Sequence, residues 1–159
     1  MRKCRSLCAV FAAAVLAVGV ACAATLEGKV TRVSDGDTIW VTPKGGRREK
    51  IRMDRIDAPE SQQEYGKEAT EYLNRRIYGK TVKVEWERRD KYGRILGVVF
   101  LEGNDINLEM VATGNAWHYA YHDKTPAYAA AEKDARANGR GLWAKPSPEN
   151  PYDFRRRNR

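Results

Sequence analysis

The feature that most constrains the fold is a series of short segments rich in β-branched and aromatic residues, separated by tight turns. In residues 81–87, apolar and charged side chains alternate, which is typical of a strand with one buried face. The predicted strands are residues 26–33, 38–41, 50–56, 81–87 and 94–101. A succession of short strands joined by tight turns predicts a closed or nearly closed barrel.

Helices are expected beside this barrel. Residues 66–77 and 105–113 each place apolar side chains on one face, and a glycine follows each segment. A third helix is predicted from Pro126, which suits the first helical turn, to the neighbourhood of Gly139. The patterns together predict an α+β, mainly β fold, in which three α-helices flank a five-stranded barrel.

Residues 1–23 have the composition of an export signal. A basic start precedes an apolar run over residues 7–20, and Ala21-Cys22-Ala23 matches the small-x-small pattern of a cleavage site. The run is shorter than the roughly 18 residues of a spanning helix. We therefore expect an exported monomer, periplasmic or extracellular, without a stable membrane span. A lipid anchor on Cys22 and a retained membrane anchor remain as alternatives.

Composition outside this segment limits the chemistry. Cysteine occurs only at Cys4, Cys8 and Cys22, so cleavage would leave no thiol for a disulfide, a metal site or a nucleophile. Residues 24–145 are enough for one domain. Residues 146–159 are rich in proline and arginine and are predicted to be a disordered tail, with a nucleic-acid-binding arm as the alternative. Much of the net charge of +8 lies in the two terminal segments.

Two acidic clusters are candidates for a metal site. Asp35 and Asp37 lie between the first two predicted strands, and Asp57 lies where the third ends. If the second and third strands form a hairpin, Asp37 and Asp57 lie side by side, and such carboxylates need a cation between them. Pro59 favours an extended Ala58, whose carbonyl could turn towards the metal. A loose shell of oxygen ligands favours Ca²⁺.

Two arginines could hold a phosphate opposite that metal. Arg52 lies on the third predicted strand, and Arg94 follows the turn at residues 90–93. A guanidinium binds two phosphate oxygens at once and neutralises charge as a phosphodiester becomes pentacoordinate. Either arginine taken alone would more often be an ordinary surface residue, so the prediction depends on the combination.

The combined motifs resemble those of the staphylococcal nuclease family. The matching segments are Ser34-Asp35-Gly36-Asp37-Thr38, Arg52, Ile56-Asp57-Ala58-Pro59-Glu60 and Asp90-Lys91-Tyr92-Gly93-Arg94. The likeness runs from about Leu26 to Trp143. It implies an OB-type barrel that binds one Ca²⁺. It also implies an endonuclease that hydrolyses DNA and RNA with little sequence specificity, leaving 3′-phosphate and 5′-hydroxyl ends.

The resemblance also implies roles for the acidic residues. Asp37 and Asp57 correspond to the metal carboxylates, Ala58 to the carbonyl ligand and Asp35 to an outer-shell acid. Ala58 stands where the family pattern has threonine, which is harmless if only its carbonyl binds. Glu60 corresponds to the carboxylate that activates or positions the attacking water.

The same resemblance assigns residues to the substrate. Arg52 and Arg94 correspond to the phosphate-binding arginines, with Arg94 nearer the leaving oxygen. Lys91 and Tyr92 correspond to contacts with a terminal phosphate. The segment between residues 61 and 66 is shorter than the lysine-bearing loop of the best-known family member, so contacts from that loop are expected to be missing.

The region around Trp117 resembles the family's base-stacking segment only across a gap. Tyr119 and Tyr121 could stack on bases, which would suit sequence-tolerant cutting, or could pack against the barrel. His118 and His122 have no third partner that would indicate zinc.

Two other functions remain to be weighed against a nuclease. A binding module of the same fold would hold nucleic acid or protein without cutting, but such modules typically lack the acidic and arginine set found here. An oligosaccharide-binding barrel with structural calcium would not need two clamping arginines.

Overall fold

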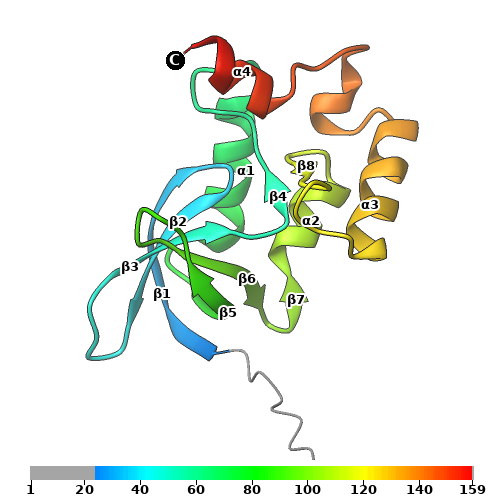
Figure 1. The fold of residues 1–159 in the computed structure, drawn as a ribbon. Helices are drawn as coiled ribbons and strands as arrows, with labels where there is room; N and C mark the ends of the chain where they lie inside the picture. The colour runs from blue at the N-terminus through cyan, green and yellow to red at the C-terminus, as the bar shows by residue number, and fades with distance from the viewer. Residues whose placement is uncertain (1–23, 159) are drawn as a thin grey trace, which may run out of the picture.

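The computed structural model describes residues 24–158, and the expected export signal at residues 1–23 lies outside the described residues. A closed barrel forms one half of the structure (Figure 1). Its strands are β1 (Ala24–Asp35), β2 (Thr38–Pro43), β3 (Glu49–Met53), β5 (Thr81–Arg89) and β6 (Ile95–Leu101).

Strand pairing closes the barrel. β1 is long enough to pair antiparallel with β2 along its second half and with β5 along its first half. β2 also pairs antiparallel with β3, and β5 pairs antiparallel with β6. The parallel pairing of β3 with β6, in which Ile51 lies opposite Ile95, joins the two ends. The mainly β, OB-like barrel predicted from the sequence is therefore confirmed.

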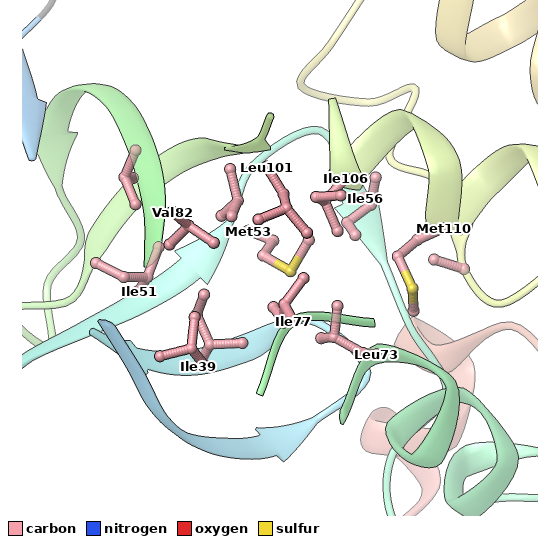
Figure 2. Packing of buried hydrophobic residues seen from close by; sticks show 14 of the residues in the cluster. Ile39, Ile51, Met53, Ile56, Leu73, Ile77, Val82, Leu101, Ile106 and Met110 are labelled. Atoms are coloured by element: carbon pink, nitrogen blue, oxygen red, sulfur yellow. The ribbon is translucent and has the colours of Figure 1, made fainter. Parts of the chain in front are cut away.

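Alternation along the strands places aliphatic side chains inside the barrel. Ile39 and Ile51 face inward from β2 and β3, and Figure 2 shows them near Val82 of β5. Helix α1 (Gly66–Ile77) covers one end of the barrel with Leu73 and Ile77, which are fully buried. Burial of these side chains is the main favourable term that fixes the position of the strands and hence of the loops at their ends.

The other predicted helices are present as α2 (Ile106–Ala112) and α3 (Pro126–Ala137). Three shorter elements lie around these helices. In chain order, β7 (Asn104–Asp105) precedes α2, β8 (Trp117–His118) lies between α2 and α3, and the 3₁₀ helix η1 (Gly141–Ala144) follows α3. Among residues 24–158, no helix combines the length and the apolar character needed to cross a membrane.

The third predicted strand is interrupted. Arg55 has a φ of 68°, a left-handed conformation that bends the chain after β3. The following strand β4 (Ile56–Asp57) leaves the barrel and pairs with β8. This bend directs Asp57 to the start of β2 rather than along the barrel wall.

The C-terminal segment corrects the expectation of a disordered tail. Residues Pro151–Arg157 form a further helix, α4, beside the loop that follows β4 (Figure 1). Asn150 caps it by accepting a hydrogen bond from the Tyr152 amide, and Pro151 occupies the first turn. The proline- and arginine-rich composition suggested disorder. The helix-start signal at Asn150 and the ion pairs of Arg155 with Asp57 and Glu60 instead stabilise a helix.

Candidate active site

A cavity of about 630 Å³ opens where β2 begins and β4 ends. Most of the residues singled out from the sequence line it: Asp35, Asp37, Arg52, Asp57, Ala58, Glu60, Lys91, Tyr92, Arg94 and Tyr119. Tyr121 is the exception, because its side chain is 83% exposed and borders a neighbouring hollow beside Tyr152.

The β2–β3 hairpin brings the two acidic clusters together. Thr38 at the start of β2 pairs with Arg52 near the end of β3. The Asp37 Oδ2 atom accepts a hydrogen bond of 2.8 Å from the Ala58 amide, which joins the first turn to the end of β4. Asp35 supports that turn, since its Oδ1 accepts a 3.0 Å hydrogen bond from the Asp37 amide.

Arg52 lies between the two metal-ligand candidates. Its Nη1 is 2.8 Å from Asp37 Oδ2, and its Nη2 is 2.9 Å from Asp57 Oδ1. Burial nevertheless raises the pKa of Asp37 to about 8, because the nearby charges of Asp35 and Asp57 add to the loss of water and outweigh Arg52. One guanidinium therefore does not fully compensate this group of carboxyls.

The donor set fits a hard divalent cation. Asp37 and Asp57 are only 6% and 3% exposed, and their ligand atoms are oxygens. An additional positive charge would favour the ionised form of Asp37, whose pKa burial raises. No group of three acidic, histidine or cysteine side chains between residues 24 and 158 already forms a ligand set. Backbone carbonyls such as that of Ala58, together with waters, would have to complete the shell.

Arg94 is held at the rim of the cavity. Its Nε is 2.7 Å from Asp90 Oδ2, and Asp90 Oδ1 accepts hydrogen bonds from the Tyr92 and Arg94 amides. Burial opposes ionisation of Asp90, but these hydrogen bonds prevail and keep its pKa below the usual value. Tyr92 is exposed, with Lys91 Nζ 5.1 Å from the centre of its ring. The turn thus presents two cations and one aromatic ring to the cavity.

In the segment around β8, the two tyrosines differ in their surroundings, and so do the two histidines. The Tyr119 amide donates to the Arg55 carbonyl at 2.8 Å, and the Tyr119 ring lies 4.9 Å from that of His122, which also lines the cavity. His118 is buried instead and pairs with Asp123 through Nε2 at 2.8 Å. His118 and His122 therefore do not form a shared ligand pair.

Arg155 is a cavity residue that the sequence interpretation missed. From α4, its Nη1 and Nη2 lie 3.0 Å and 2.8 Å from the two oxygens of Asp57, and Nη1 lies 2.8 Å from Glu60 Oε1. Hydrogen bonds with Asp57 and Glu60 raise the pKa of this guanidinium further above its usual value. The only available signals were the helix start at Asn150-Pro151 and the arginines that follow.

The sequence model described as "Staphylococcal nuclease homologue" matches residues 50–145, more than half of the chain. The chain belongs to the staphylococcal nuclease family. Membership confirms the resemblance stated from the motifs and supports nuclease function, that is, hydrolysis of phosphodiester bonds.

Similar proteins extend the match over most of the domain. An uncharacterized endonuclease of Haemophilus influenzae is 40% identical over 128 residues, which cover 80% of this chain and 72% of that protein. A second uncharacterized endonuclease, from Escherichia coli, is 41% identical over 135 residues, which cover 84% of this chain and 88% of that protein. A probable staphylococcal-like nuclease of rice, CAN2, is 40% identical over 128 residues, only 33% of its length.

Proposed function

We propose that the protein is an exported, calcium-dependent endonuclease. It hydrolyses DNA and RNA with little sequence specificity, leaves 3′-phosphate and 5′-hydroxyl ends, and acts as a monomer. One observation carries the proposal: carboxylates from two separate chain segments, Asp37 and Asp57, are buried together around a guanidinium at a cavity that also holds Glu60 and Arg94. Export rests on the composition of residues 1–23.

The cation would be held by residues at the place where β2 begins and β4 ends. Asp37 and Asp57 supply carboxylate oxygens, Ala58 supplies its carbonyl, and Asp35 acts through a bound water. When bound, calcium neutralises phosphate charge and favours attack at phosphorus. Because Asp37 and Asp57 come from different elements, the site exists only in the folded barrel.

The remaining chemistry belongs to side chains of the cavity. Arg52 and Arg94 bind the non-bridging phosphate oxygens, whose negative charge grows in the transition state. Glu60 orients a water and accepts its proton as the water oxygen bonds to phosphorus. The bond from phosphorus to the 5′ oxygen breaks, and this oxygen takes a proton from solvent because the nearby Arg94 does not give one up.

The cavity rim suits a polynucleotide of any sequence. Lys91 and Tyr92 contact a phosphate at one end of the cleaved strand, and Tyr119 stacks on a base at the cavity wall. Stacking accepts any base, because every base presents an aromatic face. Tyr121 would contribute to a longer substrate only, since it borders the adjacent hollow.

A cleavage assay on the purified protein tests this function. Plasmid, denatured DNA and RNA are incubated with Ca²⁺ or with a calcium-selective chelator, and cleavage requiring Ca²⁺ is expected. The products should prime a DNA polymerase only after phosphatase treatment, because a 3′-phosphate blocks extension. Equal cutting in the chelator would exclude calcium dependence, and intact substrate in every condition would favour the binding-only module.

A further inference from the structure

Both oxygens of Asp57 are already occupied by hydrogen-bond donors. Its Oδ1 receives Arg52 at 2.9 Å and Arg155 at 3.0 Å, and its Oδ2 receives the second Arg155 nitrogen at 2.8 Å. Both guanidinium groups therefore compete with a cation for Asp57, because each places a positive charge beside an oxygen that would bind the cation.

Arg155 is the guanidinium that can leave more easily. The Arg52 side chain is 16% exposed, lies on β3, which pairs with both β2 and β6, and also donates to the Met53 carbonyl. The Arg155 side chain is 35% exposed and lies on the short terminal helix α4, in which only Pro151 is buried. Because so little apolar surface holds α4, the helix can detach without disturbing the barrel.

The same contact engages the proposed water-activating group. Glu60 Oε1 accepts the 2.8 Å hydrogen bond from Arg155 Nη1. This hydrogen bond occupies an oxygen that would otherwise be available to orient the attacking water. Docking of α4 therefore blocks the metal ligand Asp57 and the base Glu60 at once.

The C-terminal segment is positioned for this contact. Gln63, in the loop after β4, donates to the Glu149 carbonyl at 2.6 Å, which anchors the chain just before α4. Arg157 pairs with Glu149 at 3.1 Å and so turns away from the two carboxylates that Arg155 contacts. The helix thus inserts one arginine into the cavity.

We propose that α4 is an autoinhibitory segment in which Arg155 binds both oxygens of the proposed metal ligand Asp57, and that cation binding releases it. The inference rests on the proposed function for the identity of the cation. If α4 is docked in nine of ten molecules, the apparent affinity for the cation is lowered about tenfold. Release also frees Glu60 for its proposed role.

Direct binding of Ca²⁺ tests the inference without an activity measurement. Calorimetric titration of the full chain should show Arg155→Ala binding Ca²⁺ about three- to tenfold more tightly than the unsubstituted protein. Arg155→Lys should lie between them, since ammonium pairs with one oxygen at a time. Arg156→Ala is the matched control, because Arg156 is exposed on the same helix, and it should leave affinity unchanged.

Hydrogen exchange supplies the second readout. Amides of residues 152–157 should exchange faster with saturating Ca²⁺ than with chelator, while barrel amides stay protected. Equal Ca²⁺ affinity of Arg155→Ala and the unsubstituted chain would overturn the inference and leave the proposed function intact. Absence of Ca²⁺ binding by every variant would instead overturn the calcium dependence on which both depend.

Discussion

Gly36 lies so close to Ala58 that a Cβ atom at position 36 would come within 2.7 Å of the Ala58 Cβ. The turn that carries Asp35 and Asp37 therefore packs directly on the end of β4, and glycine is required for that approach. This contact sets the separation of the two acidic clusters.

Gly36→Ala is accordingly expected to destabilise the protein by about 1–3 kcal/mol, the usual cost of overpacking, and to reduce cleavage by displacing Asp37. Guanidinium chloride unfolding measures the first effect. Adding Ala58→Gly removes the opposing methyl group while keeping the backbone carbonyl, and should recover part of the stability. If the losses of stability caused by Gly36→Ala and Ala58→Gly simply added in the double variant, a direct clash between the two side chains would be contradicted.

Arg94 and Glu60 are expected to act on the rate of cleavage. Arg94→Ala should lower kcat about 10²–10³-fold, as loss of a donor to a developing charge does, and Glu60→Gln should lower it about 10²-fold or more. Single-turnover kinetics at saturating Ca²⁺ provides the measurement. Arg75→Ala serves as the control, since Arg75 is an exposed α1 residue paired with Glu71. A normal rate in Glu60→Gln would remove Glu60 from water activation.

The two tyrosines offer a matched pair for substrate binding. Tyr119 lines the cavity, whereas Tyr121 does not. If Tyr119 stacks on a base, Tyr119→Ala should weaken binding of a short single-stranded oligonucleotide by about 1–3 kcal/mol. Tyr121→Ala should have a smaller effect. Fluorescence anisotropy in Ca²⁺, in the slow-cleaving Glu60→Gln background, measures both, and the reverse order would assign the stacking platform to Tyr121.

The raised pKa of Asp37 predicts how stability changes with pH in chelator. The folded-state pKa is about 8, against an ordinary value of 3.8. A carboxyl with a raised pKa binds more protons in the folded state, so its stabilisation is complete below pH 3.8 and is lost as the pH rises towards 8. The free energy of unfolding should therefore decrease as the pH rises between these values, and Asp37→Asn should make this decrease smaller.

Denaturant unfolding at a series of pH values measures this slope. Asp134→Asn is the control, because the Asp134 side chain is exposed and lies outside the cavity. Parallel curves for Asp37→Asn and the unsubstituted chain would show that Asp37 titrates alike in both states.

The local sequence pattern was sufficient to predict contacts between segments that are near one another in the sequence. The β2–β3 hairpin follows from two strands and one turn, and it places Asp37 beside the end of β3, from which the bend at Arg55 turns Asp57 back towards it. The break at Arg55 was not predictable in this way, since a positive φ at arginine has no residue signal. Arg155 reaches Glu60 across 95 positions, a contact that depends on how α4 docks.

Asn107 is a second residue whose role only the folded chain reveals. It is fully buried on α2, its Nδ2 donates to the Asp54 and Gly97 carbonyls at 2.8 Å and 3.1 Å, and its Oδ1 accepts from the Val99 amide at 3.0 Å. The sequence indicated only a polar position in a helix. These bonds hold the bend after β3 against β6, and that bend directs Asp57 into the cavity.

Asn107→Ala is expected to cost about 2–4 kcal/mol, because it removes the partners of the Val99 amide and the Asp54 carbonyl, at about 1–3 kcal/mol each. Cleavage should fall as well, since the bend supports the position of Asp57. The matched control is Asn104→Ala, which removes one 3.3 Å hydrogen bond to the Leu101 carbonyl from an exposed residue. Urea unfolding and Ca²⁺ titration of both variants separate the two effects. If Asn107→Ala lost stability but bound Ca²⁺ with unchanged affinity, the bend would support the barrel without positioning Asp57.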